Sequence, residues 1–590
     1  MKKILAMAVC VVCLMGTVAC KGGNAQYLDY ATGIDGQGVF DSELFFFNRN
    51  QTLGADPQII YVPQDRDETY GGYYYAYTTG GTHNVPSQYG SDVSALEIPC
   101  YRSEDMCNWE SFGALEGNSL KLTKEDWDDV ATGGFACAPE VYYDATEEMY
   151  YMYYSREAKA ENLNDGVTHS VSRCRIGIAK SDTPIGPFEP LYKTDEYTGK
   201  RIPCIDVARA FDFPGYSLID PHVFIDGNDK YLLVNHQNDI TALSNGVFGM
   251  KMTSWTDVDY ETFTCLTVPD YAEVNDTRKG KDLLTLDVDT SGCALYQSEG
   301  TVNEGAYMIR HGDKYYLTYS AFGYSAQMYS VHQAVADSPL GHFKKIAPVL
   351  DGSALDFAKG TGHHSFVEVD GETFIFYHKH GNSIQYDGAR YLAIDRCVWT
   401  KNADGVDIIT ANGPSKCLQW LPENVSGYRN LTSEAEISVN NGEGKEYLSD
   451  GMLPFYSYNF DRLFTTDKSV TITLTFKNPV SVKAVMVYNS TDIYSAFSKI
   501  KNITFDYVEK KDGYGRGIVS DLIYPARYFN IENDTIYQNS PAVAVIDEVK
   551  VNQIQIEIDQ KDRIMEFDQT GAPNSTLQLS EIVILGRKGS

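Results

Sequence analysis

The chain has 590 residues, of which 43% are hydrophobic, and its 49 Lys and Arg against 80 Asp and Glu give a formal net charge of -31. Two or three domains are expected, because this length exceeds what one ordinary hydrophobic core organises. So negative a chain repels phosphate backbones, which argues against nucleic acid as a partner.

The first twenty residues have the pattern of an export signal. "MKK" is basic, "ILAMAVCVVCLMG" is an apolar run too short to span a membrane as a mature helix, and "TVAC" places small residues before Cys20. This resembles a bacterial lipoprotein signal over residues 1–20, which implies that Cys20 is lipidated and anchors the protein in the cell envelope, at the outer membrane and facing either the periplasm or the surface. The alternative is an ordinary secretory peptide cut near Ala19.

The cysteines do not indicate a disulfide framework. Beyond the signal region they are widely spread, although Cys100 and Cys107 are close enough in sequence to pair. That part of the chain has no CxxC pair and no HExxH motif, so nothing in it indicates a zinc site.

One pattern recurs from Asp56 onward: a short strand, a polar turn, and a second strand rich in Tyr or Phe. It returns about every 80 residues, with a shorter last interval. The five units start with "DPQIIY" at Asp56, "APEVYY" at Ala138, "DPHVFI" at Asp220, "EGAYMI" at Glu304 and "HHSFVE" at His363. Five such units predict a five-bladed β-propeller, whose innermost strands line a central channel, so the five starts should converge.

The repeat ends near "GPSKCLQWLPENVSGYRN". Alternating apolar residues then follow in "SVTITLTFKNPVSVKAVMVYN", "VNQIQIEI" and "LQLSEIVILG", which predicts a β-sandwich. The expected fold is therefore all-β: a five-bladed β-propeller catalytic domain over residues 30–422, followed over residues 430–590 by a β-sandwich of the galactose-binding-like jelly-roll kind.

Three of the five converging positions carry carboxylates. Like charges held close together raise each other's pKa values. Hydrolysis of a glycoside uses such a conflict, because one carboxyl must keep its proton for the leaving oxygen while another stays ionised to activate water or attack the anomeric carbon. A third carboxylate can keep the pKa of the acid high.

These segments resemble glycoside hydrolase family 43, whose members are five-bladed propellers that invert the anomeric configuration. The match is carried by "LGADPQII", "IPCYRSEDMCNWE", "APEVYY", "LIDPHVFIDG", "NEGAYMIRHGDKYYLTYS" and "GTGHHSF", in that order. By position, the resemblance implies Asp56 as general base, Glu304 as general acid and Asp220 as the residue that modulates the pKa of the acid.

Three further residues enter through the same resemblance. His363 falls at a family histidine below the active site, where it would contact substrate or water or hold a structural calcium ion; the alternative is a hydrogen-bonded channel histidine without metal. Arg390 matches a basic family residue that contacts the hydroxyl groups of the substrate; the alternative is a salt bridge at the end of a strand. Family members often have Trp just before the "APE" segment, where this chain has Cys137, so Phe135 is the candidate sugar-binding aromatic residue. No cofactor is required.

The C-terminal region resembles the discoidin, or coagulation-factor type C, sandwich through "NLTSEAEISVNN", "YLSDGM" and "LQLSEIVILG". Binding of carbohydrate and a purely structural role are both open for it.

The expected activity is removal of terminal pentosyl units, α-L-arabinofuranosyl or β-D-xylosyl, from plant polysaccharide or oligosaccharide side chains. The alternatives on the same fold are a galactofuranosidase or galactanase, an endo-arabinanase, and a catalytically silent glycan-binding lipoprotein. A retaining, invertase-like propeller is disfavoured, because such enzymes usually show "NDPNG" where this chain has "ADPQI".

Overall fold

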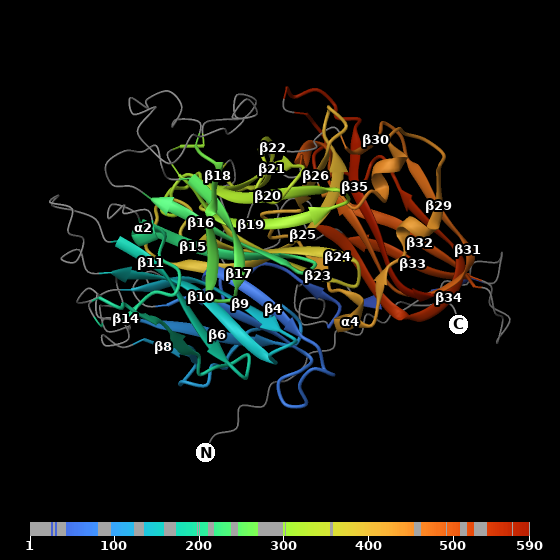
Figure 1. The fold of residues 1–590 in the computed structure, drawn as a ribbon. Coiled ribbons are helices and arrows are strands. Elements are labelled where there is room, and N and C mark those ends of the chain that lie inside the picture. Colours follow the sequence, from blue (N-terminus) through green and yellow to red (C-terminus); the bar gives the residue numbers. More distant parts are fainter. Residues whose placement is uncertain are drawn as a thin grey trace, which may run out of the picture.

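The computed structural model (Figure 1) describes most of the chain from residue 43 onward, together with two short N-terminal segments. The described residues are 25–27, 30–31, 43–80, 96–122, 135–158, 173–197, 199, 201–210, 217–237, 246–269, 299–300, 302–353, 358–453, 462–490, 492–507, 516–523, 540–568 and 570–588. Cys20 and the proposed signal lie outside them.

Five antiparallel sheets follow one another along the chain, and each is a meander of consecutive strands. Blade 1 contains β4 (Ala55–Val62), β5 (Tyr73–Thr79), β6 (Glu97–Ser103) and β7 (Glu110–Ser111), with β8 (Asn118–Lys121) paired to β6. Blade 2 contains β9 (Ala136–Asp144), β10 (Met149–Ala158), β11 (Arg173–Ser181) and β12 (Glu189–Leu191). Blade 3 contains β15 (Ser217–Asp226), β16 (Asp229–Gln237), β17 (Gly246–Ser254) and β18 (Asp257–Thr267).

Blade 4 contains β19 (Asn303–His311), β20 (Lys314–Ala321), β21 (Ser330–Ala336) and β22 (Lys344–Asp351). Blade 5 contains β23 (Gly362–Val369), β24 (Glu372–His380), β25 (Arg390–Lys401) and β26 (Asp407–Ala411). Between blades 2 and 3 lie a small sheet and one helical turn: β13 (Lys193–Thr194), β14 (Arg201–Ile202) and α2 (Val207–Ala210).

The first strands of the five blades form a ring. β4 contacts β9, β9 contacts β15, and the contacts continue through β19 and β23 back to β4. Second strands lie inside their sheets and are packed on both faces, as in β5 (YYYAYTT), where every residue after the first is buried. Large aromatic residues therefore fill the space between blades. The predicted five-bladed β-propeller is confirmed.

The ring closes where blade 5 meets the start of blade 1. The amide of Gly54 donates to the carbonyl of Arg390 at 3.0 Å, and the amide of Leu392 donates to the carbonyl of Thr52 at 2.9 Å. A two-stranded sheet of β3 (Phe45–Phe46) and β27 (Gln419–Trp420) adds a second clasp. These contacts bring the N-terminal end of β4 against the first residue of β25.

Each first strand has a β-bulge near its start, and the bulge turns one residue into the left-handed region. The φ angles are 51° at Asp56, 48° at Ala138, 56° at Asp220, 55° at Gly305 and 46° at His363. Such angles are uncommon for residues other than glycine, and bulges often re-aim side chains next to active sites.

This register corrects one prediction from the repeats. Aligning the repeats by sequence pairs Glu304 with Asp56 and Asp220, but the strand pairing places Glu304 one residue earlier, level with Ala55 and Ile219. Gly305 occupies the left-handed position instead, and a Cβ there would approach the His363 ring within about 3.1 Å. The fourth blade therefore presents its acid from the neighbouring position of the bulge.

The C-terminal strands, orange to red in Figure 1, form a second body beside the propeller, consistent with the predicted β-sandwich. They are β28 (Arg429–Asn430), β29 (Ala435–Val439), β30 (Phe464–Thr466), β31 (Val470–Asn489), β32 (Lys499–Tyr507), β33 (Arg516–Ile523), β34 (Pro541–Ile558) and β35 (Leu577–Lys588). Short helical turns accompany them: α4 (Glu423–Ser426), η6 (Thr432–Glu434), η7 (Lys445–Leu448) and η8 (Ile493–Ser495). A continuous apolar core fills this body.

Two N-terminal strands also belong to the C-terminal body. β1 (Ala25–Tyr27) pairs with β33, and β2 (Tyr30–Ala31) pairs with β34. Thus residues 30 and 31, expected at the start of the propeller region, join the other sheet. An apolar cluster that includes Phe45, Trp420 and Tyr488 packs the two bodies together.

The eight cysteines that the structure describes are free thiols, so Cys100 and Cys107 are not paired. None of the described helices is long and apolar enough to cross a membrane.

Candidate active site

Three acids from three blades meet near the starts of the ring strands. Asp56 lies on β4, Asp220 on β15 and Glu304 on β19, and they are 7%, 6% and 6% exposed. The amide of Gly305 donates to Asp220 Oδ2 at 3.0 Å, which fixes Asp220 beside the strand that carries Glu304. The charges of Glu304 and Asp56 both raise the pKa of Asp220, and the charge of Asp56 raises the pKa of Glu304, so the three acids form one electrostatic unit.

Asp56 is held in its ionised form. Arg390 Nη1 donates to Asp56 Oδ1 at 2.7 Å, and Thr79 Oγ1 donates to Asp56 Oδ2 at 2.5 Å. His363 Nδ1 lies 3.3 Å from Oδ1. Burial alone would raise the pKa of Asp56, but Arg390, His363 and His378 together outweigh burial and hold that pKa well below its usual range.

Glu304 and Asp220 are shifted in the opposite direction. Burial raises the pKa of Glu304 to about 7, with a further contribution from the charge of Asp56. Burial also raises the pKa of Asp220 to about 7, and the charges of Glu304 and Asp56 add to this, against a lowering by His363. Near neutral pH the site therefore combines one firmly ionised carboxylate with two carboxyls that can still hold protons.

Tyr329 and His378 connect the two kinds of acid, although sequence reasoning did not single them out. Tyr329 donates its hydroxyl to Glu304 Oε1 at 2.9 Å, and its ring stacks on the His378 ring at 5.5 Å. His378 Nδ1 accepts the amide of Asp56 at 3.2 Å. Burial lowers the pKa of His378 to about 3, so this imidazole is neutral.

Side chains at the ends of second strands hold the bulges of the next blade. Thr79 accepts the amide of Ala138 at 2.9 Å, Ser155 accepts that of Asp220 at 2.9 Å, and Ser320 accepts that of His363 at 2.8 Å. The signal for this is present in the sequence, because these strands contain "YTT", "YYS" and "TYS". Three of the five bulges, including the one that carries Asp220, are thus fixed by a neighbouring blade.

Comparison with known families identifies this arrangement. Residues 51–406, which include all three acids and Arg390, match the model of the glycosyl hydrolases family 43. The chain belongs to glycoside hydrolase family 43. The catalytic class predicted from the sequence, an O-glycosyl hydrolase, is confirmed at this level.

Proteins similar to this chain carry several different names. The chain is 24% identical over 255 residues to a "Xylosidase/arabinosidase" of Bacteroides ovatus, covering 40% of this chain and 66% of that relative's length. Solved structures of similar fold include a thermostable family 43 glycoside hydrolase (24% identity, TM-score 0.42, 62% of this chain and 94% of the other). Another is the exo-β-1,3-galactanase of Phanerochaete chrysosporium (14% identity, TM-score 0.37, 91% and 96%).

The remaining family 43 candidates include Arg390, which contacts one of the three acids, and Phe135. Arg390 is the first residue of β25 and contacts Asp56 directly. Phe135 is half-buried and directly precedes β9. Cys137, where family members often have Trp nearby, is close enough for the charges of Asp220 and Asp56 to raise its thiol pKa, after burial as the main cause. The stacking role of Phe135 stays a prediction.

The side chains around His363 offer little to a calcium ion. Calcium takes six to eight oxygen ligands, whereas the nearest carboxylate, Asp56, is already bonded to Arg390 and Thr79. Within the described ranges, no group of three or more His, Cys, Asp or Glu side chains is arranged to hold a metal.

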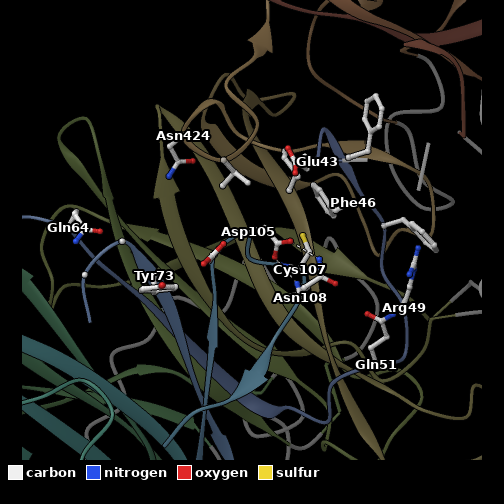
Figure 2. Close-up of a pocket in the computed structure, with 17 residues that line it drawn as sticks. Glu43, Phe46, Arg49, Gln51, Gln64, Tyr73, Asp105, Cys107, Asn108 and Asn424 are labelled. Carbon is white, nitrogen blue, oxygen red and sulfur yellow. Dashed lines mark hydrogen bonds between the residues drawn. The ribbon is translucent and has the colours of Figure 1, made fainter. Parts of the chain in front are cut away.

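A separate cleft lies elsewhere in the described residues. It measures about 770 Å³ and is lined by residues before β4, by the segment after β6 and by α4. Figure 2 shows Asp105, Asn108, Arg49 and Tyr73 around it. Asp105 is satisfied locally, accepting the amides of Cys107 and Asn108 at 2.9 and 2.7 Å. None of the three acids lines this cleft, so we place the active site at the ring strands.

Proposed function

We propose that this family 43 enzyme is an exo-acting, inverting hydrolase that removes terminal pentosyl units, α-L-arabinofuranosyl or β-D-xylosyl, from plant glycan side chains. The observation that carries the reaction is the opposition of charge states among three buried carboxyls. Asp56 has a pKa well below its usual range, while Glu304 has a pKa of about 7. Inverting hydrolysis needs this pairing of an ionised base with a protonated acid.

In the proposed reaction, Asp56 accepts a proton from a water molecule as that water attacks the anomeric carbon. Glu304 donates its proton to the glycosidic oxygen, so the bond from the anomeric carbon to that oxygen breaks as the new bond to water forms. Asp56 ends protonated and Glu304 ends ionised, and exchange with solvent restores both. Asp220 keeps the pKa of Glu304 high through its nearby charge, and Arg390 and Thr79 orient Asp56.

The pentosyl preference is supported by the name of the Bacteroides ovatus relative, "Xylosidase/arabinosidase". Retention of three acids with opposed charge states also favours an active enzyme over a silent binding protein, for which such buried carboxyls would only cost stability.

We further propose envelope anchoring through Cys20. When cells are fractionated, a Cys20→Ala variant should no longer be found in the membrane fraction. Unchanged retention in that fraction would contradict the proposal.

Hydrolysis of a panel of aryl glycosides tests the substrate, and proton NMR of the first product tests the stereochemistry. We expect turnover of aryl α-L-arabinofuranoside or β-D-xyloside, with the inverted anomer formed first. Early product of retained configuration would exclude Asp56 as a base that acts through water. Turnover of a galactoside alone would replace the pentosyl proposal.

The pH profile should respond to Asp220. Glu304 must be protonated, so activity falls as the pH rises through its pKa of about 7. Removing the neighbouring charge in Asp220→Asn lowers the pKa of Glu304, and the basic limb of kcat/KM should move to lower pH. Asp226→Asn is the matched control, because Asp226 ends the same strand and pairs with Arg310 at 2.7 Å, outside the site. An unmoved basic limb in Asp220→Asn would contradict the modulating role.

A further inference from the structure

Two loops of blades 4 and 5 expose an unusual amount of apolar surface. Residues 322–329 connect β20 to β21, and residues 381–389 connect β24 to β25. They carry Tyr324, Met328 and Ile384, which are 40%, 44% and 86% exposed and are three of the nine exposed large hydrophobic side chains in the described residues. Apolar side chains that gather at one place on a surface commonly mark a binding site. We call these three residues the rim wall.

The rim wall is braced by hydrogen bonds between the two loops. Gln327 Nε2 donates to the carbonyl of Ser383 at 3.0 Å and also to that of Ile384. His380 Nε2 bonds the carbonyl of Tyr324 at 2.8 Å, and the rings of Tyr324 and Tyr386 lie 5.9 Å apart. The apolar side chains are therefore presented on a fixed support, which reduces the entropy lost when a ligand binds.

The rim wall is continuous with the three acids. The Tyr324 ring lies 4.9 Å from the guanidinium carbon of Arg390, which in turn bonds Asp56. The same loop ends at Tyr329, whose hydroxyl bonds Glu304. The loop that carries Tyr324 and Met328 therefore contacts the acid site at two points, and Gln327 ties it to the loop of Ile384.

We propose that the rim wall binds the part of the glycan that remains after cleavage, at the second sugar beyond the scissile bond and further out. This rests on the proposed function. Glu304 protonates the oxygen that joins the removed sugar to the rest of the glycan. The loop of residues 322–329 ends at Tyr329, which bonds Glu304, so this loop lies on the side of the leaving glycan. Neutral sugar rings present C–H faces that pack on aromatic and aliphatic side chains. The ligand class is an uncharged oligosaccharide at least three units long.

The test compares substrate lengths in Ile384→Ser and Met328→Ser. The probes are arabinobiose against arabinotetraose and xylobiose against xylotetraose. We expect KM for the tetramer to rise about fivefold, the scale of one lost apolar contact, with kcat unchanged and with the dimer unaffected. Ile225→Ser is the matched control, because Ile225 is an exposed apolar residue (43%) at the far end of β15. It should change neither KM.

Equal changes in KM for dimer and tetramer, or no change for either, would overturn the proposal. Light scattering can also show whether the wild-type protein is a dimer of two chains. If Ile384→Ser loses such a protein dimer while KM for the sugar tetramer is unchanged, the rim wall is instead a contact between copies of the chain. If the wild-type protein hydrolyses neither series, the proposed function fails. Calorimetry still tests the rim wall in that case: tetramer should bind Glu304→Gln more tightly than Glu304→Gln/Ile384→Ser, and equal binding would overturn it.

Discussion

Asp56→Asn is expected to lower kcat by about 10²–10⁴-fold, because the amide cannot take a proton from the attacking water. The pKa of Asp56 lies well below its usual range, so the wild-type carboxylate stays ionised at every pH above about 5. The activity lost in Asp56→Asn should therefore not return at any pH above about 5. The charge of Asp56 also raises the pKa values of Glu304 and Asp220. Residual activity should therefore decline at lower pH than in the wild type.

The variant also leaves the buried guanidinium of Arg390 without its counter-charge, which should destabilise the fold by roughly 3 kcal/mol. Activity must accordingly be measured well below the melting temperature, with circular dichroism as a check of folding. Asp370→Asn is the matched control, because Asp370 also has a left-handed φ, of 52°, but is exposed at the turn after β23. Near-wild-type kcat in folded Asp56→Asn would remove Asp56 from the mechanism.

Glu304→Gln is expected to lose about 10²–10⁴-fold in kcat on natural linkages and far less on substrates whose leaving group needs no proton. Glycosyl fluorides and dinitrophenyl glycosides have leaving groups, fluoride and dinitrophenolate, that depart as stable anions. Protonation by residue 304 therefore adds little to the rate with these substrates. The measurement is the ratio of activities on the activated and natural substrates for the variant and the wild type. Equal losses on both would contradict the role of Glu304 as the acid.

The same variant carries its own folding control. A carboxyl whose native pKa is raised above the unfolded value penalises the native state when both states are ionised, and for Glu304 this holds in full above a pH of about 7. Glu304→Gln removes that penalty, so its melting temperature at pH 8 should exceed that of the wild type. A large loss of activity together with a gain in stability would identify a residue retained for chemistry.

The sequence was sufficient for the repeat and the reaction class, because each unit is local. A strand, a turn and an aromatic strand lie within about 30 residues, so the starts at Asp56 and Asp220 are visible without a structure. Glu304 was found, but its register was off by one residue. Sequence alignment cannot show which residue of a bulge turns left-handed, and Gly305 shows this only once the strand pairing is known.

The supporting residues were harder to foresee. Tyr329 lies 25 positions from Glu304, and Arg390 lies 334 from Asp56. Such contacts depend on which blades become neighbours, and no local propensity encodes that. Arg390 entered only through its resemblance to a family residue, whereas His378 and Tyr329 match no motif that marked them in the sequence.

Ring closure sets the order in which the catalytic machinery can mature. Asp56 is made early during synthesis, but Arg390, His363 and His378 all come from the last blade, so the Asp56 carboxylate is not ion-paired until blade 5 docks onto blade 1. Chains released after four blades would carry all three acids and still lack the guanidinium that bonds Asp56. Hydrolytic activity of this protein therefore also indicates that the whole propeller has been synthesised.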